Sequence, residues 1–163
     1  MKTLFIIRHA KSSWDIGTLS DFERPLNERG KKDAPAMAQR LLDKKISLDA
    51  FVSSPAKRAK QTAEHFSSAY KKDEADIIFV EALYHAGIST FYKTVENIND
   101  SFNAVALFSH NPGITEFINS LTSVRLDNMP TCGIFAVKVD IKKWSEFKKT
   151  PKEFLFFDYP KAL

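Results

Sequence analysis

Residues 3–9 read TLFIIRH, an apolar run that ends in a guanidinium and an imidazole. Residues 104–110, AVALFSH, repeat this pattern, and residues 50–55, AFVSSP, begin in a similar way. Strands that are apolar on both faces are typical of a parallel sheet with helices on both sides. These runs therefore predict the central, buried strands of an α/β fold.

Apolar runs of this kind alternate with longer segments of helical periodicity. We expect strands near residues 2–8, 49–53, 77–80, 104–109 and 133–139. We expect helices near residues 27–45, 55–70, 88–99 and 112–122. The alternation predicts a three-layer α/β/α sandwich with a largely parallel central sheet.

Two helix starts and the C-terminal tail refine this prediction. Ser54-Pro55 and Asn111-Pro112 each read as an N-cap followed by proline at the first helical position. Residues 153–159, EFLFFDY, would leave a large apolar patch if they stayed exposed. We therefore expect the tail to join the sheet as an edge strand.

Size and composition indicate one globular domain, residues 1–163, that is 44% hydrophobic and 27% charged. The net charge of +4 comes from scattered lysines, so we expect no nucleic-acid partner. Cys132 is the only cysteine, which excludes an intrachain disulfide and fits a reducing compartment. Arg8 interrupts the N-terminal apolar run, and no stretch approaches the ~20 apolar residues of a membrane span. We expect a cytoplasmic protein with no membrane contact.

Cationic and imidazole side chains stand at or just beyond the ends of three of the expected strands. They are Arg8 and His9 after the first strand, Arg58 after the second, and His110 after the fourth. The C-terminal ends of parallel strands lie along one edge of a sheet, where ligands bind. We therefore expect these four side chains to meet in one pocket that suits a phosphoryl group.

Three motifs around these residues resemble the signatures of the histidine phosphatase superfamily, which has a phosphoglycerate mutase-like fold. They are residues 7–12 (IRHAKS), 53–63 (SSPAKRAKQTA) and 109–113 (SHNPG). Residues 21–30 (DFERPLNERG) and 83–86 (LYHA) also resemble the compact bacterial phosphohistidine phosphatases of the SixA type. The resemblance extends over most of the chain.

The resemblance implies a role for each of the four residues. His9 would attack phosphorus and become phosphohistidine, which water then hydrolyses; a neutral imidazole is a competent nucleophile near neutral pH. Arg8 and Arg58 would offer forked donors to the phosphoryl oxygens, and His110 would supply another donor. No cofactor is implied, and the spacing of the histidines does not suggest a metal site.

The proton donor to the leaving group is less well defined by the sequence. Glu81 follows the strand expected at residues 77–80 and is the first candidate, with Asp15 and His85 as alternatives. A solvated carboxylate with no catalytic role is an equally good interpretation of Glu81. A phosphoramidate places less demand on such an acid, because its nitrogen leaving group is readily protonated.

The favoured substrate is therefore phosphohistidine on a protein. Longer members of the family that the chain resembles insert a helical lid between the Arg58 motif and the strand at residues 104–109, where this chain has only about 40 residues. The resemblance therefore implies no lid and an open site. One alternative is a small-molecule phosphomonoesterase with the same mechanism. The other is a phosphoprotein-binding module that is nearly inactive.

Overall fold

The computed structural model describes residues 1–14 and 17–161 of the chain. The strands are β1 (Lys2–Arg8), β2 (Ala50–Ser53), β3 (Ile78–Phe79), β4 (Ala104–Ser109), β5 (Ile134–Val139) and β6 (Lys152–Asp158). The helices are α1 (Glu28–Asp43), α2 (Lys57–Ala69), α3 (Ile88–Glu96) and α4 (Gly113–Asn119). Short 3-10 turns are η1 (Asp21–Glu23), η2 (Glu74–Asp76), η3 (Glu81–Leu83) and η4 (Trp144–Glu146).

The six strands form one mixed sheet in the order β3-β2-β4-β1-β5-β6. Strands β3, β2, β4 and β1 are parallel, whereas β5 and β6 are antiparallel to their neighbours. The predicted sheet is thus parallel over four strands and antiparallel over two. The C-terminal tail forms β6 at one edge, as expected from its apolar composition.

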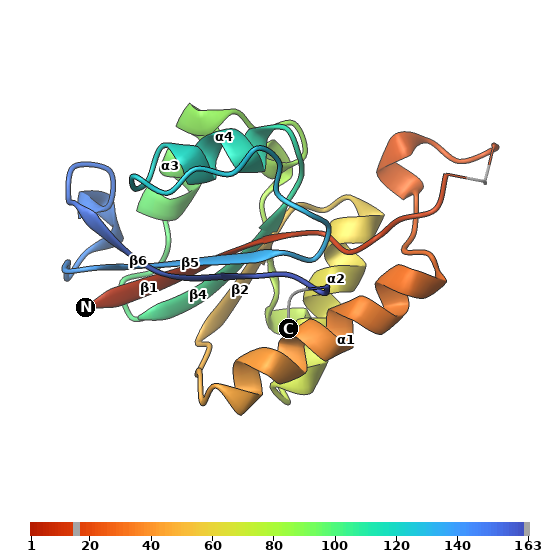
Figure 1. The fold of residues 1–163 in the computed structure, drawn as a ribbon, viewed down its shortest axis with the longest axis horizontal. Helices are drawn as coiled ribbons and strands as arrows, with labels where there is room; N and C mark the ends of the chain where they lie inside the picture. Colours follow the sequence, from red (N-terminus) through yellow and green to blue (C-terminus); the bar gives the residue numbers. More distant parts are fainter. Residues whose placement is uncertain (15–16, 162–163) are drawn as a thin grey trace.

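Helices cover both faces of the sheet, which confirms the predicted three layers (Figure 1). Helices α1 and α2 pack on one face over a cluster that includes Phe66 and Phe108. Helices α3 and α4 pack on the other face over a cluster that includes Phe91 and Phe117. Among the described residues, no helix is long and apolar enough to cross a bilayer.

Two helices begin later than the sequence predicted. Helix α2 begins at Lys57 instead of Pro55, and α4 begins at Gly113 instead of Pro112. The predicted capping side chains have other partners: the Ser54 hydroxyl contacts His110, and the Asn111 amide binds the 128–129 segment. These side chains join separate loops at the sheet edge instead of capping the helices.

The strand order brings the predicted site residues to one edge of the sheet. Strand β4 lies between β1 and β2, and its register pairs Arg8 with Ser109 and Ser53 with Phe108. The three strands therefore end at the same level. The loop before the antiparallel strand β5 also reaches this edge, where the Cys132 amide donates to the Arg8 and His9 carbonyls, each at 3.0 Å.

Candidate active site

A pocket of about 300 Å³ opens at this edge of the sheet. Its lining includes all four predicted residues, Arg8, His9, Arg58 and His110. The volume lies at the small end of the range for ligand sites, on the order of 300–1,000 Å³. Helix α3, which the structure describes in full, packs on α4 and contributes no residue to the pocket lining.

His9 lies at the base of the pocket with one tautomer selected. Its side chain is 6% exposed, and Nδ1 lies 2.8 Å from the Ala10 carbonyl oxygen. A carbonyl only accepts hydrogen bonds, so Nδ1 carries the proton and Nε2 keeps its lone pair. The His110 ring centroid lies 5.2 Å away. His9 therefore has the protonation pattern that a nucleophile requires.

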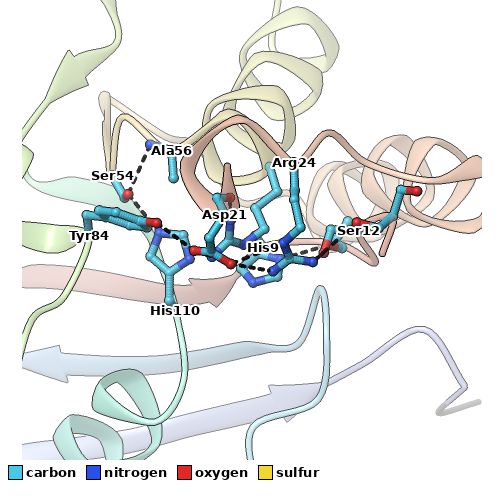
Figure 2. Close-up of polar contacts among 11 residues, drawn as sticks. His9, Ser12, Asp21, Arg24, Ser54, Ala56, Tyr84 and His110 are labelled. Carbon is cyan, nitrogen blue, oxygen red and sulfur yellow. Dashed lines mark hydrogen bonds and ion pairs between the residues drawn. The ribbon is translucent and has the colours of Figure 1, made fainter. Parts of the chain in front are cut away.

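His110 is held from the end of β2. Its Nε2 lies 2.7 Å from the oxygen of the Ser54 hydroxyl, which accepts a 3.2 Å hydrogen bond from the Ala56 amide (Figure 2). The Ser54 hydroxyl can donate its proton to Nε2, and the neutral ring then carries its own proton on Nδ1. The His110 Nδ1 is buried and has no hydrogen-bond partner among the described residues. The ring is thus fixed at one nitrogen and available at the other.

Both imidazoles are neutral in the free protein. Burial holds the pKa of His9 well below the ordinary histidine value, although the bond to Ala10 raises it in part. Burial, followed by the nearby Arg58 charge, lowers the pKa of His110 to about 3. Burial, together with the nearby positive charges, therefore keeps both rings in the neutral form.

We expect the ring proton resonances of His9 and His110 to remain those of neutral imidazole when the free protein is titrated by NMR from pH 8 to pH 5.5. A histidine peptide in the same buffers should titrate near pH 6.5. Because the folded-state pKa values are lowered, the unfolded chain binds more protons below about pH 6.5, and the free energy of unfolding should fall there. A midpoint for either ring near pH 6.5 would contradict this result.

Helix α2 is tied to the segment that carries the nucleophile. The Ala10 amide donates to Thr62 Oγ1 at 2.9 Å, and the Thr62 hydroxyl donates to the Arg58 carbonyl at 2.8 Å. This relay joins the end of β1 to the first turn of α2. It fixes the spacing between His9 and Arg58, which are 49 positions apart (58 − 9) in the sequence.

The two arginines keep donors that the protein does not use. Arg8 donates from one terminal nitrogen to the Met129 carbonyl at 2.8 Å. Arg58, which is 5% exposed, donates to the carbonyl and the carboxylate of Asp21 at 2.6 and 3.0 Å. The Nε of each arginine is buried without a partner among the described residues. Buried donors of this kind are costly unless a ligand satisfies them.

Asp21 is the pocket residue to which the sequence assigned no role. Its carboxylate receives a 2.5 Å hydrogen bond from Tyr84 and ion pairs from Arg24 and Arg58 (Figure 2). These bonds, first that from Tyr84, hold the pKa of Asp21 far below its usual range. Residues 21–30 and 83–86 stood out as motifs, but nothing in either one indicates that Asp21 contacts Tyr84 or Arg58.

Glu81 does not line this pocket. It is exposed and begins the turn η3, where the chain leaves the sheet edge. Asp15 lies outside the described residues. His85, the other alternative, lines the pocket from the 83–86 segment. Among the described residues that line the pocket, Asp21 is the sole carboxylate.

The loop that bears Tyr84 and His85 is packed tightly against α4. A Cβ atom at Gly113 would lie 1.9 Å from the Ala86 carbonyl oxygen, so the backbones approach more closely than any side chain allows. Glycine at this position lets the loop reach the pocket.

Within residues 1–14 and 17–161, no cluster of three or more His, Cys, Asp or Glu side chains could hold a metal ion.

Comparison with known proteins places these features in a family. Residues 4–87 match the model of the histidine phosphatase superfamily (branch 1). A protein of Mycobacterium leprae is 28% identical and aligns over 95% of this chain and 100% of its own length.

Two solved structures share the fold. A proposed phosphohistidine phosphatase SixA from Agrobacterium tumefaciens has a TM-score of 0.80 at 23% identity, over 98% of both chains. The protein histidine phosphatase SixA complexed with tungstate has a TM-score of 0.81 at 22% identity, over 97% of both chains.

Proposed function

Since this chain belongs to the histidine phosphatase superfamily, we propose that it hydrolyses phosphohistidine on proteins through a phosphorylated His9. The observation that carries this proposal is a set of buried polar atoms that have no partner in the part of the chain that the structure describes. They are the Nε atoms of Arg8 and Arg58 and the Nδ1 of His110, and all three residues line the pocket that holds His9. A phosphoryl group carries the oxygen acceptors that such donors need.

The first chemical step forms one bond and breaks another. The Nε2 lone pair of His9 attacks phosphorus, and the bond from phosphorus to the substrate nitrogen breaks with its electron pair. The proton of His9 stays on Nδ1, hydrogen-bonded to the Ala10 carbonyl, so the new phosphohistidine carries a cationic ring. Charge spreads over three equatorial oxygens, where Arg8, Arg58 and His110 stabilise it.

The second step returns His9 to its starting state. Water attacks the phosphorus of the intermediate and loses a proton to solvent, and the bond to Nε2 breaks. Because the proton on Nδ1 never left, His9 departs as a neutral imidazole and is not an anionic leaving group. The same tautomer therefore serves attack and release.

The state of Asp21 supports this substrate class. Its pKa is held far below the usual range and its oxygens are occupied by Tyr84, Arg24 and Arg58, so it has no proton to give. A phosphate ester leaves as an alkoxide and needs a general acid. A phosphoimidazole that is protonated at its second nitrogen leaves as neutral imidazole without one. This difference favours phosphohistidine over phosphate esters.

We expect the purified protein to hydrolyse a phosphohistidine peptide with a kcat/KM at least about 10²-fold above its values for phosphoserine peptide and sugar phosphates. This factor is the lower end of what a general acid typically contributes. EDTA should leave the rate unchanged, since we propose a metal-independent reaction. Equal or higher rates on the esters would support a small-molecule phosphatase. Binding without turnover of any substrate would support the binding module.

A further inference from the structure

We propose that Asp21 is the positioning residue for Arg58. Asp21 binds two donors of the Arg58 guanidinium and thereby orients the remaining donors of Arg58 toward the phosphoryl group. The inference rests on the proposed function and adds a residue to it. Asp21 is not assigned to touch the substrate, and its action on the reaction passes through Arg58.

Asp21 binds Arg58 through its main-chain carbonyl and its side-chain carboxylate. One terminal nitrogen of Arg58 donates to the Asp21 carbonyl at 2.6 Å, and the other donates to Oδ2 at 3.0 Å. A guanidinium has five N–H donors in a rigid plane. Two of them are used by Asp21, which fixes the plane and leaves three that Asp21 does not use. One of those three is on Nε, which has no protein partner among the described residues.

Asp21 is itself held rigidly enough to act as a support. Oδ1 accepts from Arg24 at 3.1 Å, and Oδ2 accepts from Tyr84 at 2.5 Å in addition to Arg58. Figure 2 shows Asp21 between Tyr84 and Arg24, which approach from opposite sides. These bonds use both carboxylate oxygens. The carboxylate therefore cannot rotate toward the substrate without breaking two ion pairs.

The partners of Asp21 anchor it to three separate parts of the pocket wall. Arg24 also donates to the Ser12 hydroxyl at 2.9 Å, and its guanidinium carbon lies 3.6 Å from the centre of the Trp14 ring. Tyr84 packs edge-on against Phe22, with ring centroids 5.0 Å apart. The network thus links the 12–14 segment, η1 and the loop after η3 to the first turn of α2.

The charge of the Asp21 carboxylate also helps to keep the arginines of the pocket in place. Arg8, Arg24 and Arg58 all line a pocket of about 300 Å³. Their mutual repulsion disfavours a fixed position for any one of them, and a carboxylate between two of them offsets it. An asparagine would keep the shape of the side chain but lose this charge and weaken the bond to Arg58.

The test is Asp21→Asn measured in two backgrounds, the natural chain and Arg58→Ala, with phosphohistidine peptide under steady-state conditions. In the natural chain, we expect kcat to fall about 10- to 100-fold, the usual effect of removing a group that orients a functional side chain. In the Arg58→Ala background, Asp21→Asn should change the rate less than about 2-fold, because residues that act as a unit are not additive.

Two controls separate this role from a general loss of structure. Asp33→Asn removes a carboxylate that pairs with Arg29 on α1 at 3.4 Å, away from the pocket, and should leave kcat unchanged. Tyr84→Phe removes the hydroxyl bond to Asp21 but keeps the ring, and should lower kcat about 3- to 10-fold with an unchanged melting temperature, as expected for one hydrogen bond.

The positioning role is overturned if Asp21→Asn lowers the rate by the same factor with and without Arg58. It is also overturned if Asp21→Asn raises the rate, which would show that the carboxylate obstructs the pocket. A natural chain that does not hydrolyse phosphohistidine would instead contradict the proposed function. In that event, tungstate binding by the natural chain and by Asp21→Asn decides the positioning role: weaker binding by the variant supports it, and equal binding overturns it.

Discussion

Replacement of His9 by alanine is expected to abolish turnover of phosphohistidine peptide, with a fall in kcat of about 10⁴-fold or more. His9 offers an unprotonated Nε2 at the base of the pocket, and the Ala10 carbonyl holds the proton on the other ring nitrogen. Without this atom, the phosphoryl group has no protein nucleophile. The remaining arginines and His110 can bind the substrate but cannot accept the group from it.

The measurement is phosphate release under steady-state conditions, with melting temperature as a check on folding. His65→Ala is the matched control, because His65 is a half-buried histidine on α2 that does not line the pocket. It should retain the rate of the natural chain. If His9→Ala turned over substrate at more than one-hundredth of the natural rate, another group would be the nucleophile.

Replacement of Arg58 by alanine is expected to lower kcat/KM by about 10²- to 10³-fold, the typical cost of removing one donor to a developing oxyanion. The Arg58 guanidinium is buried in the pocket and keeps three of its five donors free of Asp21. Phosphate, vanadate and tungstate should all bind more weakly to the variant, because each is an oxyanion whose oxygen atoms accept hydrogen bonds from the same donors.

Calorimetric titration with tungstate measures this loss without any turnover. Arg29→Ala, which removes an exposed arginine of α1 that pairs with Asp33, should bind tungstate as the natural chain does. An Arg58→Ala variant with unchanged tungstate affinity would place the guanidinium outside the anion site, whatever its effect on the rate.

Much of the fold could be predicted because its central strands are buried on both faces. Strands β1 and β4 have the predicted bounds, residues 2–8 and 104–109, because each is built around a continuous run of buried apolar side chains. The tail was predicted as an edge strand from the cost of exposing its phenylalanines. The direction of β5 could not be predicted, because a short strand with two buried faces has the same pattern in either orientation.

The site was predictable to the extent that strand ends determine it. Arg8, His9, Arg58 and His110 lie at or shortly after the ends of adjacent strands, and the sheet order brings them to one pocket. The same reasoning selected Glu81 as the candidate proton donor, and Glu81 does not line the pocket. Strand β3 is only two residues long, and the chain turns at once into η3, so Glu81 remains exposed.

Asp21 could not be assigned from the sequence for a related reason. It lies in a loop between β1 and α1, and its contacts with Tyr84 and Arg58 span 63 and 37 positions. No periodicity relates these residues, because the path of a loop depends on its own side-chain contacts. The 3-10 turn η1 and the Arg24–Asp21 pair set that path.

The central claim is that His9 carries the phosphoryl group, and peptide mapping of the trapped enzyme tests it most directly. The protein is mixed with phosphohistidine peptide, quenched in alkali within milliseconds, digested and analysed by mass spectrometry. We expect one phosphorylated peptide, from the N-terminal segment, with the phosphoryl group on His9. A phosphoryl group on any other residue, or rapid turnover with no phosphorylated peptide at any time, would contradict it.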